Sequence, residues 1–515
     1  GGGTLIESLP LAESIPIGND ACRAGPRGHQ WREDADSTLV WFEALDGGDP
    51  KAEVEHRDAV YTQDFPIKAD PQELVRTQWR LKGLWWGDDD VVLVREGDWK
   101  TRKSRMLQVN TTSPADSPKE PLLEYETQDR YNHPGNPVTV RSLDGRRVLE
   151  RDDGAILMIG AGGSDTGDRP FVDKRRLLGD GVSERNAGAE RLWRCEEGEV
   201  YESPICLLKE DGGWTLLTSR ETNVDVPNVW EVKLGSGERK QVTFTEHPQP
   251  ALLGVQKQLI KYKRKDGLEL SGMLYLPAGY KPEEGGTLPT LLWAYPQEFK
   301  NASSASQVQG SPHMFIRVPP TSPLLWLSRG YAVLDNPSMP IVGEDGKEEN
   351  DNFVEQLVDS AEAAVEELKR RGISDERIAV GGHSYGAFMT ANLLAHSKLF
   401  KAGIGRSGAY NRLLTPFGFQ SEERTLWEAP EAYLKMSPFM HADKIDAPLL
   451  LLHGEADNNP GTFPLQSERL FQALRGLGKK SRLVLLPLES HGYAAKESVL
   501  HMCWEMDSWL QEHMK

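Results

Sequence analysis

The sequence predicts an all-β domain followed by an α/β domain whose sheet is mostly parallel. Short apolar runs bounded by Gly, Asp and Pro extend from about residue 30 to 250, whereas strands alternate with amphipathic helices after residue 250. At 515 residues the chain is also too long for one compact core. We therefore expect one domain over residues 1–250 and a second over residues 251–515.

The first half of the chain has the composition of short β-strands. Its aromatic-rich or alternating runs lie next to Gly- or Asp-containing turns. The clearest runs are Thr38–Leu45, Val91–Val94, Ala155–Ile159, Trp214–Ser219 and Val229–Leu234.

A loose repeat organises these strands. An Asp/Gly turn followed by two strands recurs near Asp36, Gly87, Asp153 and Gly212, at intervals of roughly 50 to 65 residues. This pattern predicts about four units of an incomplete β-propeller. A pair of β-sandwiches is the alternative.

The second half begins with a hairpin-like stretch, Gln258–Leu276, and then alternates strands with helices. The helix over Phe353–Arg371 repeats apolar residues at spacings of three and four, and Gly372 provides a stop signal. The further expected strands are Leu288–Tyr295, Tyr331–Asp335, Arg377–Gly381, Ala402–Arg406, Pro448–His453 and Arg482–Pro487, and the further helices are Tyr385–His396, Phe463–Leu477 and Lys496–His513. Such alternation predicts a parallel sheet covered on both faces.

Composition excludes several classes of function. The formal charge of −18 argues against nucleic-acid binding, and no run approaches the roughly 18 apolar residues of a membrane helix. The mean hydropathy of −0.53 indicates a soluble protein. Four scattered cysteines lack paired spacing and are expected to be free thiols in a reducing compartment. The opening Gly1–Gly3 without a Met indicates a processed or truncated product.

A candidate nucleophile lies between a strand and a helix. The pentapeptide Gly382–Gly386 reads G-H-S-Y-G, follows the apolar run Ile378–Val380 and opens a helix. This is the sequence context of a nucleophile elbow, in which Ser384 projects from the carboxyl edge of the sheet.

An acid and a base follow in the order that this fold requires. Asp457 comes after the strand Leu449–Leu452, and His491 comes after the strand Leu483–Pro487. Taken one at a time, these would be a surface acid and a loop histidine. Together with Ser384 they predict a catalytic triad.

Two donors are expected to stabilise an oxyanion. One is the backbone N–H of Tyr385, the residue after the nucleophile, at the positive end of its helix. The second is the phenol of Tyr295, which follows the strand around Leu291–Ala294. A buried aromatic side chain at a strand end is the alternative for Tyr295.

No cofactor or metal is expected. The sequence lacks H-E-x-x-H and paired Cys/His ligands. Gly403–Gly408 matches G-x-G-x-x-G, but no helix opens within it, so a strand end is the better interpretation. The run Gly160–Gly163 is interpreted as a turn.

The motifs resemble the prolyl oligopeptidase family of serine peptidases, which combines a β-propeller with an α/β-hydrolase domain. The stretches Trp293–Lys300, Gly381–Met389 and Arg406–Gln420 resemble the glutamyl endopeptidase branch, known from chloroplasts. The resemblance assigns the catalytic roles to Ser384, Asp457 and His491 and the oxyanion role to Tyr295. This sequence departs from the family pattern in two respects. It shows about four blades, where about seven are usual, and it lacks the usual N-terminal segment.

The resemblance implies peptide substrates cleaved after Glu, and a chloroplast stroma location. A pocket that binds the Glu side chain of the substrate needs an arginine that pairs with its carboxylate, and the candidates are Arg406 and Arg412. Surface arginines paired with Glu422 or Glu423 are the alternative.

Two other functions stay open: a carboxylesterase or lipase with the same triad, and a non-catalytic propeller scaffold. The sequence does not predict an oligomeric state.

Overall fold

The computed structural model describes residues 5–9, 11–67, 70–87, 90–141, 145–179, 188–210, 213–343 and 347–515. Gly1–Gly3 and the expected turn residue Gly212 lie outside these ranges. The chain divides into two compact units. The first comprises Gly1–Ser164, Asp168–Arg220 and Asn228–Phe244, and the second comprises Asp165–Gly167, Glu221–Pro227 and Thr245–Lys515.

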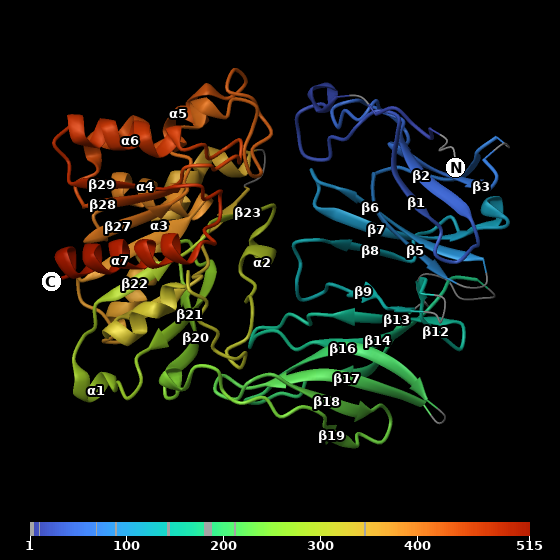
Figure 1. The fold of residues 1–515 in the computed structure, drawn as a ribbon, viewed down its shortest axis with the longest axis horizontal. Coiled ribbons are helices and arrows are strands. Elements are labelled where there is room, and N and C mark those ends of the chain that lie inside the picture. The colour runs from blue at the N-terminus through green and yellow to red at the C-terminus, as the bar shows by residue number, and fades with distance from the viewer. Residues whose placement is uncertain are drawn as a thin grey trace. The chain divides into compact units, whose positions relative to one another are not determined.

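The first unit contains four antiparallel sheets that follow one another along the chain (Figure 1). The first sheet is β1 (Pro26–Trp31), β2 (Thr38–Ala44), β3 (Asp58–Asp64) and β4 (Gln72–Thr77), and the second is β5 (Arg80–Gly87), β6 (Val91–Asp98), β7 (Lys103–Asn110) and β8 (Leu123–Glu126). The third contains β12 (Arg151–Asp152), β13 (Ala155–Gly160), β14 (Phe171–Arg176) and β15 (Ala189–Arg194), with β9 (Asn136–Pro137) added beside β13. The fourth is β16 (Tyr201–Glu210), β17 (Gly213–Glu221), β18 (Asn228–Lys233) and β19 (Arg239–Gln241). A short pair, β10 (Thr139–Arg141) and β11 (Arg147–Leu149), and two 3₁₀ turns, η1 (Ala12–Ser14) and η2 (Pro114–Asp116), complete this unit.

Each sheet packs against the next through alternate side chains of its inner strands. On β6, Val92 and Val94 lie in a cluster with the first sheet, while Leu93 between them packs toward the third. On β13, Ile156 packs toward the second sheet and Leu157 toward the fourth. Because successive side chains of a strand point to opposite faces, the second and third sheets are layers buried on both sides. This succession of four layers confirms the predicted all-β, propeller-like architecture.

The second unit is built on an eight-stranded mixed sheet. Its order is β20-β21-β24-β22-β26-β27-β28-β29, with β20, β21 and β24 paired antiparallel and the remaining pairs parallel. The strands are β20 (Gln256–Lys263), β21 (Glu269–Leu276), β22 (Thr290–Trp293), β24 (Ala332–Asp335), β26 (Ile378–His383), β27 (Ala402–Arg406), β28 (Leu449–Gly454) and β29 (Ser481–Leu486). The predicted α/β-hydrolase fold is confirmed by this sheet.

Helices cover both faces of this sheet (Figure 1). The apolar sides of α3 (Phe353–Arg370), α4 (Tyr385–His396) and α6 (Leu465–Gly476) share one core cluster, whereas α7 (Lys496–His513) packs in a second cluster on the other face. Gly372 has a φ of 69° just after α3, which explains why a glycine stands there. The smaller elements are α1 (Pro282–Gly285), α2 (Ala302–Ala305), α5 (Pro430–Met436), the parallel pair β23 (Gln297–Phe299) and β25 (Pro340–Val342), η4 (Pro250–Leu252), η5 (Pro323–Arg329), η6 (Glu349–Asn352), η7 (Arg412–Leu414) and η8 (Pro438–Lys444).

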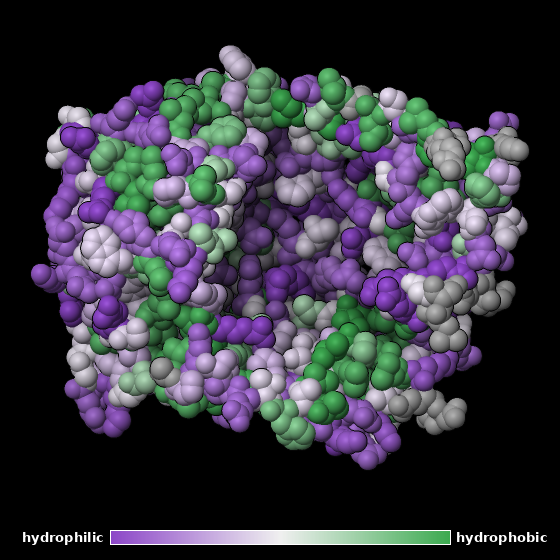
Figure 2. Space-filling model, viewed as in Figure 1, coloured by the Kyte–Doolittle hydropathy of each residue, from purple (hydrophilic) through white to green (hydrophobic). Residues whose placement is uncertain are grey.

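The described part of the chain contains no helix long and apolar enough to cross a bilayer. Nor do its His, Cys, Asp and Glu residues form a cluster of three or more that could hold a metal ion. All four cysteines are free thiols. Figure 2 shows a hydrophobic patch over the fourth sheet, where Ile205 and Leu208 of β16 are 51% and 44% exposed.

Candidate active site

Ser384 lies in the tight turn between β26 and α4, with φ 57° and ψ −116°. Two glycines make this turn possible. A Cβ on Gly382 would lie 2.4 Å from the carbonyl carbon of Gly386, and a Cβ on Gly386 would lie 2.4 Å from the carbonyl oxygen of Ala294. The backbone N–H of Ser384 donates to the carbonyl oxygen of Arg406 at 2.8 Å, which fixes the turn to β27. These contacts give the strained strand-to-helix geometry of a nucleophile elbow.

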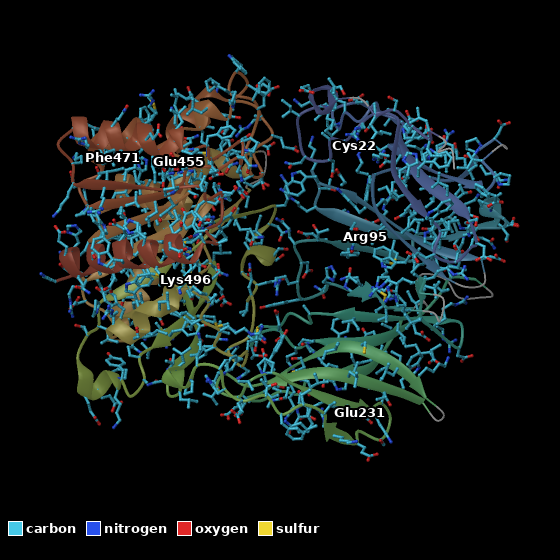
Figure 3. All side chains as sticks on the ribbon, viewed as in Figure 1. Cys22, Arg95, Glu231, Glu455, Phe471 and Lys496 are labelled. Carbon is cyan, nitrogen blue, oxygen red and sulfur yellow. The ribbon has the colours of Figure 1, made fainter. Side chains whose placement is uncertain are left out.

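Asp457 and His491 lie in the loops that follow β28 and β29. The Nδ1 of His491 and the Oδ2 of Asp457 are 2.9 Å apart. A carboxylate can only accept, so Nδ1 carries the proton and Nε2 is left to accept a proton from a nucleophile. Figure 3 labels two residues near these loops: Glu455, two residues before Asp457, and Lys496, the first residue of α7.

A second histidine, His453 at the end of β28, also binds Asp457. Its Nε2 lies 2.6 Å from the carbonyl oxygen of Thr462 and 3.1 Å from Oδ2 of Asp457, so this nitrogen must carry the proton. Its Nδ1 then accepts from the Ser467 hydroxyl at 2.7 Å. Burial lowers the pKa of His453, which is therefore neutral at pH 7.

The carboxylate of Asp457 is thus held by several donors. Besides the two histidines, the Thr462 hydroxyl lies 3.2 Å from Oδ2, and the Asn459 backbone N–H donates to Oδ1 at 3.0 Å. The Asp457 side chain is fully buried. These bonds offset the cost of burying the charge and fix the orientation of the carboxylate toward His491. Sequence reasoning missed His453, although its position four residues before Asp457 was visible.

His491 lies next to the elbow. Its ring centroid is 4.8 Å from that of His383, the residue directly before Ser384. Burial, together with the nearby charge of Arg406, lowers the pKa of His383 to about 3, so this ring is neutral. The structure thereby brings the three predicted triad residues to one edge of the sheet.

Tyr295 stands in the loop after β22 and faces the same turn. Its side chain interacts with Ser384, and its hydroxyl accepts a hydrogen bond from Nε2 of Gln420 at 3.3 Å. Tyr295 is 45% exposed, so it is not the buried aromatic of the alternative interpretation. Burial of its hydroxyl end raises its pKa, which keeps the phenol protonated and able to donate. Its ring packs edge-on against Tyr385, with ring centroids 5.7 Å apart.

Beneath this turn the side chain of Tyr385 points into the core. Its hydroxyl donates to Oε1 of Glu298 at 2.7 Å, and both side chains are buried. Burial raises the pKa of Glu298 to about 7. The guanidinium of Arg412 lies 5.4 Å from the ring of Tyr385 and 4.2 Å from the ring of Phe388. Burial lowers the pKa of Arg412 to about 10, so it remains a cation at neutral pH.

Arg406 lies on the other face of the sheet. Its guanidinium packs 4.4 Å from the ring of Trp293 and donates through Nη1 to the carbonyl oxygen of Thr321 at 2.9 Å. Burial lowers its pKa to about 10. Arg406 and Arg412 are 8% and 3% exposed, so neither is the surface arginine of the alternative interpretation.

Among the residues that the structure describes, neither Arg406 nor Arg412 forms an ion pair with an acid. Glu422, the acid suggested as a partner, pairs instead with Arg424 at 2.8 Å. The two arginines contact different core clusters, so they do not form a joint site for one carboxylate.

The fold and this edge of the sheet define the class of the protein: an α/β hydrolase with the residue arrangement of a serine hydrolase. Residues 345–515 match the model of the prolyl oligopeptidase family. The C-terminal part of the chain therefore carries a domain of that family.

The relatives bear out the resemblance read from the sequence. The chain is 47% identical to two proteins named "Probable glutamyl endopeptidase, chloroplastic", from Oryza sativa subsp. japonica over 98% of this chain and 55% of that protein, and from Arabidopsis thaliana over 98% and 53%. The chain thus spans about half the length of these curated relatives. Among solved structures, the Pyrococcus horikoshii acylaminoacyl peptidase has a TM-score of 0.61 at 17% identity, covering 95% of this chain and 71% of that one. This last similarity concerns the fold alone.

Proposed function

We propose that this chain is a serine peptidase that cleaves peptide bonds through an acyl-enzyme intermediate. The observation that carries the proposal is the 2.9 Å hydrogen bond between Asp457 and His491 beside the Ser384 elbow. In this reaction the Ser384 hydroxyl attacks the scissile carbonyl while Nε2 of His491 takes its proton and then passes it to the leaving amine. Asp457 keeps His491 in the required tautomer.

The backbone N–H of Tyr385 and the phenol of Tyr295 are the proposed oxyanion donors. Tyr385 is the first residue of α4, where backbone N–H groups lack partners within the helix. The protonated phenol of Tyr295 interacts with Ser384 from the opposite loop. Two donors directed at one oxygen stabilise the charge that develops in the transition state.

We further propose that the residue before the cleaved bond is Glu. The printed names of the two plant relatives support this substrate, and the buried arginines supply the chemistry. Arg412 is the stronger candidate because its neighbour Tyr385 directly follows the proposed nucleophile, and because aromatic rings pack on its guanidinium while it forms no ion pair among the described residues. Glu298 acts on this cation electrostatically without an ion-pair contact, and a substrate carboxylate would supply such a contact. The same names support a chloroplast location, within which we propose the stroma.

The test is a peptidase assay with peptides that differ only before the scissile bond, where Glu, Gln, Pro, Lys or Ala is placed. We expect a preference for Glu over its neutral isostere Gln. Arg412→Met should lower kcat/KM for the Glu peptide by about 30-fold or more, since truncating one partner of a buried charge pair costs at least about 2 kcal/mol. Arg469→Met, at an exposed position on α6, is the matched control and should keep the preference.

Other outcomes separate the parts of the proposal. Equal cleavage rates for the Glu and Gln peptides would refute the Glu-binding pocket but would be consistent with the proposed triad. Turnover of a simple aryl ester but of no peptide would indicate an esterase. A fluorophosphonate probe should label the chain but not the Ser384→Ala variant, and labelling of that variant would refute the nucleophile.

A further inference from the structure

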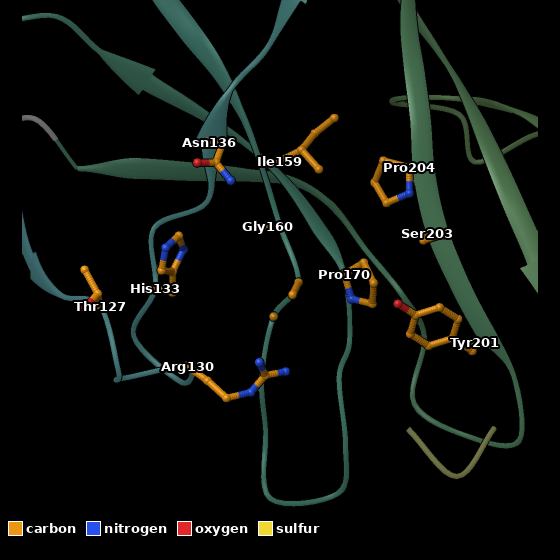
Figure 4. A pocket seen from close by; sticks show the side chains of 12 residues that line it. Thr127, Arg130, His133, Asn136, Ile159, Gly160, Pro170, Tyr201, Ser203 and Pro204 are labelled. Atoms are coloured by element: carbon orange, nitrogen blue, oxygen red, sulfur yellow. The ribbon is translucent and has the colours of Figure 1, made fainter. Parts of the chain in front are cut away.

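A pocket of about 440 Å³ lies in the first unit, between the third and fourth sheets. Figure 4 shows Arg130, His133 and Asn136 on one side of it and Tyr201 on the other, with the Arg130 guanidinium and the Tyr201 hydroxyl directed toward its middle. The backbone of Gly160–Gly162 forms part of its wall, so the glycine run singled out in the sequence leaves this wall without large side chains. The volume suits a small molecule or the end of a short peptide.

The polar groups that line this pocket are mostly hydrogen-bond donors. The backbone N–H of Gly135 donates to Nδ1 of His133 at 3.0 Å, so the proton of the neutral ring is on Nε2. Arg95 donates through Nη1 to Oδ1 of Asn136 at 3.2 Å, which leaves the NH₂ group of this amide as a donor. Among the described residues that line the pocket, none is Asp or Glu.

Two cations lie at the pocket of this acidic chain: Arg130 in its lining and Arg95, which donates to the lining residue Asn136. Arg130 binds both carboxylate oxygens of Asp168 at 2.9 Å, and this pair holds its guanidinium in place. Arg95, labelled in Figure 3, packs 5.1 Å from the ring of Trp85 and forms no ion pair among the described residues. Burial lowers the pKa of His133, and the charges of Arg95 and Arg130 lower it further, while the charge of Asp129 acts in the opposite direction.

We propose that this pocket binds a carboxylate group, with Arg130, His133 and Asn136 as its donors. Convergent N–H donors near an unpaired cation match the two oxygens of a carboxylate. The apolar side chains of Ile159 and Pro170 in the same lining would contact the body of the ligand. The site lies outside the catalytic domain and does not depend on the proposed activity of Ser384.

The experiment is a calorimetric titration of the full chain with glutarate and with its neutral analogue glutaramide. The deciding variant is Asn136→Asp, because it keeps the contact with Arg95 but places a negative charge in the pocket. We expect it to weaken glutarate binding by about tenfold or more. Gln72→Glu is the matched control, since it makes the same amide-to-acid change at an exposed position on β4. A glutarate site elsewhere on the chain would contribute equally to both variants.

The proposal is supported if glutarate binds, glutaramide does not, and only Asn136→Asp loses the binding. It is overturned if glutarate does not bind, if glutaramide binds equally well, or if Asn136→Asp binds glutarate like the unmodified chain. Far-ultraviolet circular dichroism and thermal unfolding of both variants show whether the fold is kept. A second titration with trialanine and its C-terminal amide identifies the source: binding of the free acid alone indicates a peptide carboxyl end, and binding of glutarate alone indicates a small dicarboxylate.

Discussion

Replacing Ser384, the proposed nucleophile, by glycine should stabilise the protein relative to replacing it by alanine. With φ 57° and ψ −116°, Ser384 occupies a backbone region that a residue with a Cβ rarely adopts. Alanine keeps the Cβ and the strain, whereas glycine removes both. Strain of this kind costs about 1–3 kcal/mol, and the greater freedom of glycine in the unfolded chain offsets about 0.5–1 kcal/mol of the gain. The net advantage of Ser384→Gly over Ser384→Ala should therefore be up to about 2.5 kcal/mol.

Thermal unfolding of the two variants measures this difference. At this size a change of 1 kcal/mol moves the midpoint by about 2–4 °C, so the Ser384→Gly variant should unfold a few degrees higher. Neither variant has a nucleophile, so self-cleavage cannot distort the comparison.

Ser490 provides the matched control. It lies in the loop directly before His491, is exposed, and has no positive φ. There the order should reverse, with Ser490→Gly less stable than Ser490→Ala by about 0.5–1 kcal/mol. If Ser384→Gly were no more stable than Ser384→Ala, the elbow would not be strained and the reasoning would be wrong.

Three further predictions concern the site. A Cβ on Gly382 would lie 2.4 Å from the backbone of the following helix, so Gly382→Ala should slow fluorophosphonate labelling by about 100-fold, whereas Gly492→Ala, where nothing lies within 4 Å, should label normally. His453→Phe removes a donor to Asp457 and should lower kcat/KM by about tenfold, while His453→Gln, which can still donate, should lose less; equal losses would contradict the hydrogen-bond argument. Burial raises the pKa of Glu298 to about 7, so the folded state favours the protonated acid, and stability should fall as the pH rises from about 4.5 to 7. In denaturant titrations across that pH range, the Glu298→Gln variant should lack this loss of stability, which is on the order of 3 kcal/mol. If the variant loses the same stability, a group other than Glu298 causes the pH dependence.

Strong local patterns were enough to predict the frame of the catalytic domain. The helix expected over Phe353–Arg371 is α3, and the strands expected around Ser384 are β26 and β27, because long apolar periodicity and buried runs dominate there. The parallel pair β23 and β25 was missed because three-residue strands carry no usable period. In the first unit, the longer strands β4 and β7 were missed because charged and amide side chains separate their few apolar residues. The structure contains four sheets there, where the sequence showed about four repeats.

The site was predictable in part. A sequence motif with its strand context locates Ser384, but a partner such as His453 acts only through a tertiary contact with a carboxylate. The direction of a side chain is likewise invisible in the sequence. Arg406 and Arg412 were suggested together, yet their guanidinium groups pack on Trp293 and Phe388, in different clusters.

The strand order of the catalytic domain has a consequence for the protein as it is synthesised. Ser384 follows the fifth strand of the sheet in chain order, whereas the loops that carry Asp457 and His491 follow its two last strands, β28 and β29. A nascent chain that has emerged only as far as β27 therefore has the nucleophile but neither the acid nor the base. Under the mechanism proposed above, peptide cleavage would therefore require nearly the whole domain to have left the ribosome.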